Sequence, residues 1–81
     1  MKVKVLVFAH IKEIVGSGEI TLELDNGCKG DDVLGKLTEL HPQLADHCKY
    51  LKLSMNGEYI SNDDQVLENS EIAIFPPVSG G

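Results

Sequence analysis

The stretch DDVLGKLTEL, residues 31–40, decides the fold because it is the one segment that predicts a helix of useful length. Apolar residues recur along it and just beyond it every three or four positions, at Val33, Leu37, Leu40 and Leu44. This spacing predicts one apolar stripe that faces a core. The two opening aspartates carry the charge and the capping oxygens that a helix N-terminus favours. Gly35 weakens the helix by about 1 kcal/mol relative to alanine. His41 precedes Pro42, which disfavours continued helix, so Leu44 is assigned to a separate short turn.

Before this helix the sequence predicts two strands joined by a short helix. Residues 2–9 alternate between two faces, with valines at positions 3, 5 and 7 on one of them. Residues 11–15 keep helical spacing for about one and a half turns, and Gly16 ends them. Residues 20–24 alternate again, and the turn-forming Asp25-Asn26-Gly27 follows.

After the helix the sequence predicts three more strands. Residues 51–55 alternate, and Asn56-Gly57 is typical of a two-residue hairpin that returns the chain through Tyr59-Ile60. Residues 71–75 alternate as the last strand. One sheet needs one covering layer, and one good helix is available to supply it. We therefore expect an α+β fold of the β-grasp kind, with one helix across a mixed sheet of four to five strands. Residues 1–75 form the predicted domain, and residues 76–81 a C-terminal tail.

The charge balance of the chain bears on its partners. Thirteen acidic and seven basic residues give the 81-residue chain a net charge of −6. Nucleic acid and anionic membranes need a basic surface, so neither is expected as a partner. An acidic surface favours docking on basic partners, or serves solubility alone. No run approaches the roughly 18 apolar residues of a membrane span, and no signal peptide is recognised at the start. We expect a cytoplasmic protein.

Cysteines and histidines do not predict a metal or redox site. Cys28 and Cys48 have no metal-ligand spacing and are expected to be free thiols in a reducing compartment. His47 lies next to Cys48, but adjacent side chains diverge on a helix or a strand. No metal ligand set is predicted.

The predicted sheet leaves an apolar face without a covering layer. If the helix covers the valine side of the first strand, Leu6, Phe8, Ala73 and Phe75 face away from it, and Tyr59 joins them. A surface patch with three aromatic rings is typical of a protein docking site. The alternative is that a loop or the early short helix covers these residues.

The tail, Pro76-Pro77-Val78-Ser79-Gly80-Gly81, carries the predicted chemistry. The two prolines hold an extended backbone, and the glycines bring no side chain that would obstruct a narrow channel; a plain loose terminus is the alternative. A carboxylate at Gly81 is a poor electrophile and needs activation, for example as an acyl-adenylate. The chain has no phosphate-binding loop of its own, so an activating enzyme is expected as a partner.

The tail resembles the C-terminal signature of the small subunit of molybdopterin synthase, a ubiquitin-like sulfur carrier. Val5-Leu6-Val7-Phe8-Ala9 and Glu13-Ile14-Val15-Gly16 are similar to the first strand and short helix of that family. Asn69-Ser70 departs from the family's usual Gly-Asp before the last strand. Asparagine tolerates left-handed backbone, so we expect the turn to be kept.

The resemblance implies a fold and a function. It implies a β-grasp fold, adenylation of Gly81 with ATP by an enzyme of the ubiquitin-activating type, and conversion to a thiocarboxylate by a sulfur donor enzyme. It also implies a large synthase subunit, in a heterotetramer of two small and two large subunits, that holds the catalytic residues. There the sulfur passes to a cyclic pyranopterin precursor to build the dithiolene that holds molybdenum. The partner-binding residues implied are Phe8, Tyr59, Phe75, Pro76, Pro77, Val78, Ser79 and Gly80. The chain itself is expected to bind no cofactor.

Two other functions are compatible with a Gly-Gly tail. The sulfur could go to thiamine or tRNA instead, although the Pro-Pro-Val-Ser lead-in argues against this destination. Alternatively, the chain is a ubiquitin-like modifier that is joined through Gly81 to lysines of other proteins.

Overall fold

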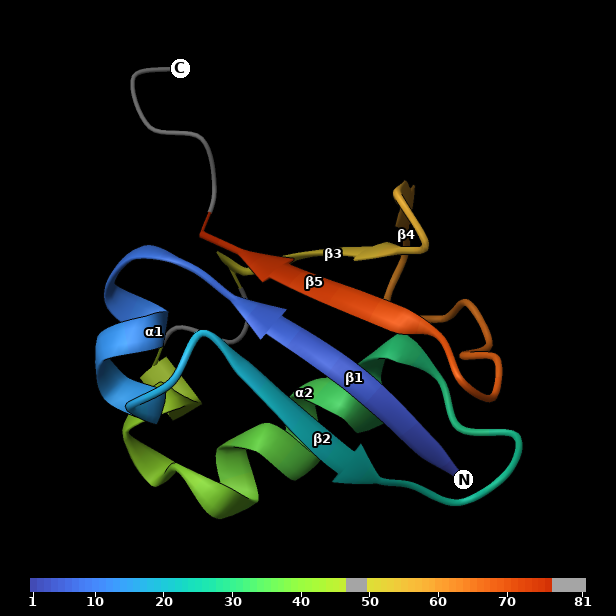
Figure 1. The fold of residues 1–81 in the computed structure, drawn as a ribbon, viewed down its shortest axis with the longest axis horizontal. Helices are drawn as coiled ribbons and strands as arrows, with labels where there is room; N and C mark the ends of the chain where they lie inside the picture. Colours follow the sequence, from blue (N-terminus) through green and yellow to red (C-terminus); the bar gives the residue numbers. More distant parts are fainter. Residues whose placement is uncertain (47–49, 77–81) are drawn as a thin grey trace.

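The computed structural model describes residues 1–46 and 50–76. These residues contain two α-helices, a 3-10 helix and five strands. Figure 1 shows how they are arranged. In chain order these are β1 (Lys2–Val7), α1 (Ala9–Val15), β2 (Glu19–Glu23), α2 (Gly30–Leu40), the 3-10 helix η1 (Pro42–Asp46), β3 (Lys52–Met55), β4 (Glu58–Ile60) and β5 (Glu71–Phe75).

The five strands form one mixed sheet in the order β2-β1-β5-β3-β4. The two central strands, β1 and β5, are parallel although they lie at opposite ends of the chain, and the other neighbours are antiparallel. Helix α2 crosses one face of the sheet, and α1 lies at the end of β1 (Figure 1). This is the α+β, β-grasp arrangement that the sequence predicts.

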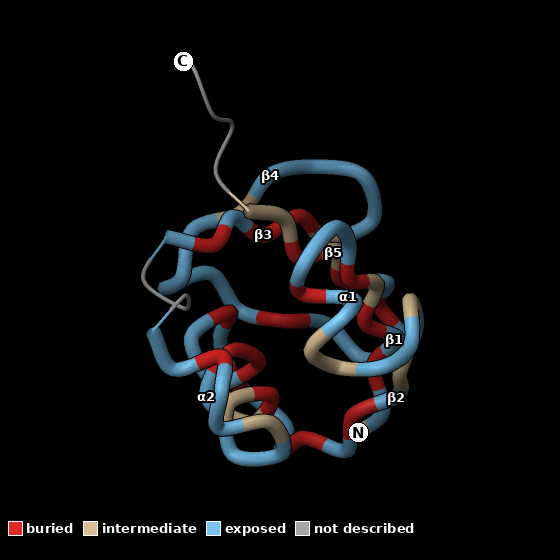
Figure 2. Tube along the Cα trace, turned by 90° about the vertical axis from the view of Figure 1, so that its left-hand side faces the viewer, coloured by how far each residue is buried: buried red, intermediate tan, exposed pale blue. Residues whose placement is uncertain are grey.

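The core lies between α2 and the inner face of the sheet. Strand alternation places Val3, Val5 and Val7 there, all almost fully buried. Exposed residues alternate with them along β1 (Figure 2). Ile72 and Ile74 of β5 are buried beside them. Each such side chain contributes about 1.5–3 kcal/mol through burial.

Helix α2 begins and ends where local chemistry dictates. The carboxylate of Asp32 accepts a hydrogen bond of 2.7 Å from the backbone N–H of Lys29, the residue before the helix. The helix ends at Leu40, and Leu44 is buried in η1, so the predicted break before Pro42 is confirmed.

The predicted place of Leu40 in the core is wrong, since this side chain is 52% exposed. The buried face of α2 consists of Gly30, Val33, Leu34 and Leu37. These positions follow the i, i+3, i+4, i+7 pattern of a stripe centred between Val33 and Leu34. Leu40 lies at the margin of that stripe, and the chain leaves the helix there.

Asparagine adopts left-handed backbone in two turns. Asn56 and Gly57 have φ values of 52° and 90° and close the hairpin between β3 and β4, as the Asn-Gly signal predicts. Asn69, with φ of 62°, leads toward β5. The expectation that asparagine sustains the turn at this position is confirmed.

Candidate docking surface on the outer face of the sheet

The outer face of the sheet, opposite α2, carries the predicted partner-binding residues of the body. Leu6 and Ala73 are in register on β1 and β5. Ala73 is in register with Ser54, and Ser54 with Tyr59, so this row of the sheet extends to β4. Phe75 forms the next row with Lys52. We call Leu6, Phe8, Tyr59, Ala73 and Phe75 the apolar patch.

Phe75 connects the three aromatic rings of the apolar patch, which come from three separate segments of the chain. The rings of Phe8 and Phe75 are stacked, with centroids 5.4 Å apart and an interplanar angle of 11°. Tyr59 meets Phe75 edge-on, with centroids 6.1 Å apart. Such pairs contribute about 0.5–1.5 kcal/mol beyond the burial of their area. Phe75 is therefore the centre of the patch.

The apolar patch is open to solvent in the described structure. Phe8 is 42% and Tyr59 77% exposed, and Leu6, Ala73 and Phe75 are partly buried. Neither α1 nor a described loop buries these rings, so the prediction that the outer face is uncovered is confirmed. Contiguous apolar surface with aromatic rings is characteristic of protein docking sites.

A sharp backbone turn ends β1 beside Phe75. Phe8 has extended backbone, with φ of −134°, and Ala9 after it has φ of 54°. Left-handed backbone costs a non-glycine residue roughly 1–2 kcal/mol. The turn starts α1 and leaves Phe8 on the outer face of the sheet, in contact with Phe75.

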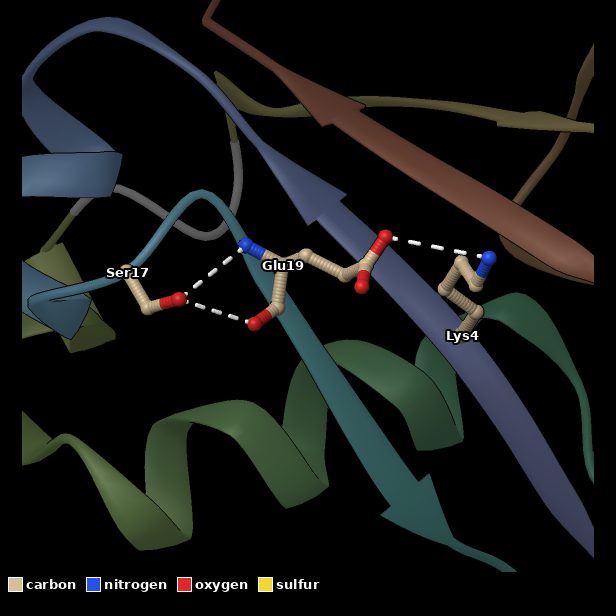
Figure 3. A network of polar contacts seen from close by, with 3 residues as sticks. All are labelled: Lys4, Ser17 and Glu19. Carbon is tan, nitrogen blue, oxygen red and sulfur yellow. Dashed lines mark hydrogen bonds and ion pairs between the residues drawn. The ribbon is translucent and has the colours of Figure 1, made fainter.

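A polar network lies on the β2 side of the apolar patch (Figure 3). Glu19 is in register with Leu6, and its carboxylate is 3.7 Å from the ammonium nitrogen of Lys4. The Ser17 hydroxyl donates a hydrogen bond to the carbonyl of Glu19 at 2.9 Å and accepts one from its N–H at 3.3 Å. This side of the patch therefore has its charges matched within the chain.

The predicted tail begins at the apolar patch. Pro76 is bonded to Phe75 and is partly buried. Pro77, Val78, Ser79, Gly80 and Gly81 lie outside the described residues, so their predicted roles stay predictions. The structure thus brings together Phe8, Tyr59, Phe75 and Pro76 of the predicted site residues.

The remaining reactive side chains do not form a second site in the described residues. Residues 1–46 and 50–76 contain no group of three or more His, Cys, Asp or Glu placed to hold a metal ion. Cys28 is buried, and burial, reinforced by the nearby Asp32 carboxylate, raises the pKa of its thiol. The thiol therefore stays neutral at pH 7 and is a weak nucleophile. Cys48 and His47 lie outside the described residues. In the described part of the chain, no helix has the length and apolar character needed to cross a membrane.

Two residues of this face were not singled out from the sequence. Lys52 is exposed and lies in register with Phe75, and Ser54, only 8% exposed, lies between Ala73 and Tyr59. The alternation of residues 51–55 places both on the outer face. Their position next to Phe75 depends on the register between β3 and β5, which alternation does not give.

Comparison with known proteins agrees with this geometry. The ThiS family matches residues 5–81 of the chain. The chain belongs to the ThiS family. Among the relatives of this ThiS-family chain is the molybdopterin synthase sulfur carrier subunit of Chlamydomonas reinhardtii, 37% identical over 83 residues with full coverage of both chains. Another is small archaeal modifier protein 1 of Haloferax volcanii, 31% identical, with 93% of this chain and 95% of the relative covered. The predicted family resemblance is confirmed.

Solved structures show the same fold. The crystal structure of the Haloferax volcanii modifier matches this ThiS-family chain with a TM-score of 0.86 at 27% identity, covering all of both chains. A complex of subunits 1 and 2 of the molybdopterin-converting factor from Helicobacter pylori contains a chain that matches with a TM-score of 0.68. At 20% identity, with both chains fully covered, this second likeness concerns the fold alone.

Proposed function

We propose that this ThiS-family chain is the sulfur carrier subunit of a molybdopterin synthase. Four relatives with that name match 96–100% of the chain at identities of 33–40%. The observation that carries the proposal is the placement of the aromatic cluster, because the three rings meet at Phe75, the residue to which the tail is attached. A partner that docks on the apolar patch is therefore next to the start of the tail.

The chemistry takes place at Gly81, with catalytic groups supplied by partners. A carboxylate oxygen of Gly81 attacks the α-phosphorus of ATP on an activating enzyme of the ubiquitin-activating type, and pyrophosphate leaves. Sulfur at the oxidation level of sulfide, delivered by a donor enzyme, then attacks the acyl carbon, and AMP leaves with the electron pair of the broken C–O bond. The product is a thiocarboxylate, a far better nucleophile than the carboxylate.

The second stage takes place in the large synthase subunit. The thiocarboxylate sulfur attacks an oxygen-bearing carbon of the cyclic pyranopterin monophosphate precursor, and the carbon–oxygen bond breaks so that the oxygen leaves with the electron pair. Water then cleaves the acyl–sulfur bond. This restores the Gly81 carboxylate and leaves sulfur on the pterin, where two such sulfurs make the dithiolene.

This division of labour requires that the small and large subunits associate. Two small and two large subunits form the heterotetramer in the cytoplasm, and the catalytic residues lie on the large subunit. The chain itself holds no cofactor, and ATP is consumed by the activating enzyme. Residues 77–80 serve as the part of the tail that the partner grips. Phe8, Tyr59, Phe75 and Pro76 form the contact surface on the body.

A second candidate is a protein modifier joined through Gly81 to lysines. The observation that favours it is the match to small archaeal modifier protein 1 over almost the whole of both chains. Both functions need the same acyl-adenylate, and they differ in the group that attacks it, a sulfur donor or a lysine amine.

Intact mass spectrometry separates these outcomes. The chain is incubated with the activating enzyme of its own source, ATP and a sulfide donor, and a variant lacking Gly81 serves as the control. The sulfur carrier function predicts a product with one oxygen replaced by sulfur, absent from the control. This product must then convert the pyranopterin precursor when the large subunit is added. Unchanged mass, together with Gly81-dependent products joined to other proteins, would overturn the proposal in favour of the modifier.

A further inference from the structure

The charges around the apolar patch are not distributed evenly. Along β5 the outward positions change from a carboxylate at Glu71, through Ala73, to the ring of Phe75. On the β2 side, Glu19 is paired with Lys4. At the end of the sheet where the tail begins, the charged residue in register with Phe75 is Lys52. The end of the patch at Glu71 carries both signs, because Lys4 is in register with Glu71, whereas the end next to the tail carries the cation Lys52.

Lys52 has no partner within the described part of the chain. It is exposed, it is the first residue of β3, and residues 1–46 and 50–76 place no carboxylate within ion-pair distance of its ammonium group. It also has a sign opposite to the net charge of −6. The net charge of the chain favours a partner that is basic overall. Lys52, a cation beside the docking rings, instead favours an acidic group on the part of the partner that faces it.

We propose that Lys52 orients the docked chain by pairing with a carboxylate of the large synthase subunit, next to the place where that subunit receives the tail. This inference rests on the proposed function and adds a specificity-determining contact to it. The apolar patch supplies affinity without fixing rotation about its centre. One charge pair at the tail end of the patch favours the productive orientation, in which residues 76–81 meet the place where the large subunit receives the tail. The same pair cannot form in the reversed orientation.

The physical basis is that a charge at the rim of an interface acts mainly on encounter and register. Complementary charges raise the association rate and suppress wrong orientations, whereas affinity depends more on buried contacts. The effect is screened by salt, because the Debye length falls from about 10 Å at 0.1 M to about 3 Å at 1 M. Lys52 is thus expected to affect the association rate constant in a salt-dependent way.

The test compares charge reversals at two lysines. Lys52→Glu and Lys36→Glu each change the net charge from −6 to −8, since each removes one positive charge and adds one negative charge. Lys36 lies on α2, which covers the opposite face of the sheet. Association with the purified large subunit of the same source is measured by stopped flow at low and at high ionic strength. Circular dichroism verifies that both variants are folded.

We expect Lys52→Glu to slow association by roughly 5- to 10-fold at low salt, in line with typical effects of rim charges on encounter. Lys36→Glu should stay within about twofold of the unsubstituted chain, and high salt should bring all rates together. Lys52→Arg, which keeps the charge, should restore the rate. Equal effects of Lys52→Glu and Lys36→Glu would overturn the orienting role while leaving the proposed function intact. Absence of any binding by the unsubstituted chain would overturn the proposed function itself, and this inference with it.

Discussion

Gly35 shows how a single residue limits the stability of this domain. It lies on the exposed side of α2, and a Cβ atom added there meets nothing within 4 Å apart from its chain neighbours and the backbone of its own helix. Alanine loses less backbone entropy than glycine when a helix forms. We therefore expect Gly35→Ala to raise the free energy of unfolding by about 0.5–1 kcal/mol. Urea denaturation followed by circular dichroism measures the change.

Gly30 provides the matched control within the same helix. A Cβ atom at this buried position would lie 2.8 Å from a methyl carbon of Leu53 and 3.1 Å from the carbonyl oxygen of Ser61. Gly30→Ala should therefore lower the free energy of unfolding, by about 1–3 kcal/mol, as overpacked core substitutions do. If both substitutions had the same sign, packing would not be what distinguishes the two glycines.

At the scale of elements, most strands and turns could be predicted because their signals are local. The alternation in β1 and β5 identifies the buried valines and isoleucines, and Asn56-Gly57 specifies its own turn. The exposure of Leu40 could not be predicted from spacing, because more than one set of apolar residues in α2 fits helical periodicity. Packing against the sheet buries the set that includes Leu34 and leaves Leu40 exposed.

The free edge of β2 gives the second prediction. The backbone groups of Gly18 and Leu24 form hydrogen bonds with β1. Hydrogen-bonding groups point alternately to the two sides of a strand. The backbone groups of the odd-numbered residues from Glu19 to Glu23 therefore face solvent. Unpaired edge groups invite pairing with another chain. The Ser17 hydroxyl occupies both groups of Glu19 (Figure 3). Ser17→Ala should therefore lower the free energy of unfolding by about 0.5–1.5 kcal/mol. It should also increase self-association at high concentration, as sedimentation velocity would detect.

Ser17→Thr is the control for the edge prediction, because threonine keeps a hydroxyl group that can make both hydrogen bonds. It should behave like the unsubstituted chain in both measurements. A Ser17→Ala variant that stays monomeric and equally stable would show that the charges of Glu19 and Glu23 protect this edge without the hydroxyl.

At the scale of the whole molecule, the site was predictable in part. The face that carries Phe8, Tyr59 and Phe75 follows from strand parity and the family resemblance. The contacts between their rings depend on the pairing of β1 with β5 and of β5 with β3. The first of these pairings joins segments more than 60 residues apart in the chain. Lys52 could not be connected with Phe75 for the same reason. Tertiary pairing, which local patterns in the sequence do not reveal, determines the neighbours of each outward side chain.

The central position of Phe75 leads to the last prediction, which concerns docking as distinct from folding. Its ring contacts both Phe8 and Tyr59 and lies on the outer face, away from the core beneath α2. Phe75→Ala should therefore leave a folded domain, with a loss of about 1–3 kcal/mol in the free energy of unfolding from two ring pairs. Binding to the large synthase subunit should weaken by more than about 2 kcal/mol, roughly 30-fold or more in the dissociation constant, since central aromatic residues dominate such interfaces.

Leu67→Ala removes an apolar side chain that is 55% exposed outside the apolar patch, and it should leave binding within about twofold. Isothermal titration calorimetry measures both variants against the unsubstituted chain, and circular dichroism verifies their folds. If Phe75→Ala bound as tightly as Leu67→Ala, the tail alone would supply the affinity, and the apolar patch would have no part in docking.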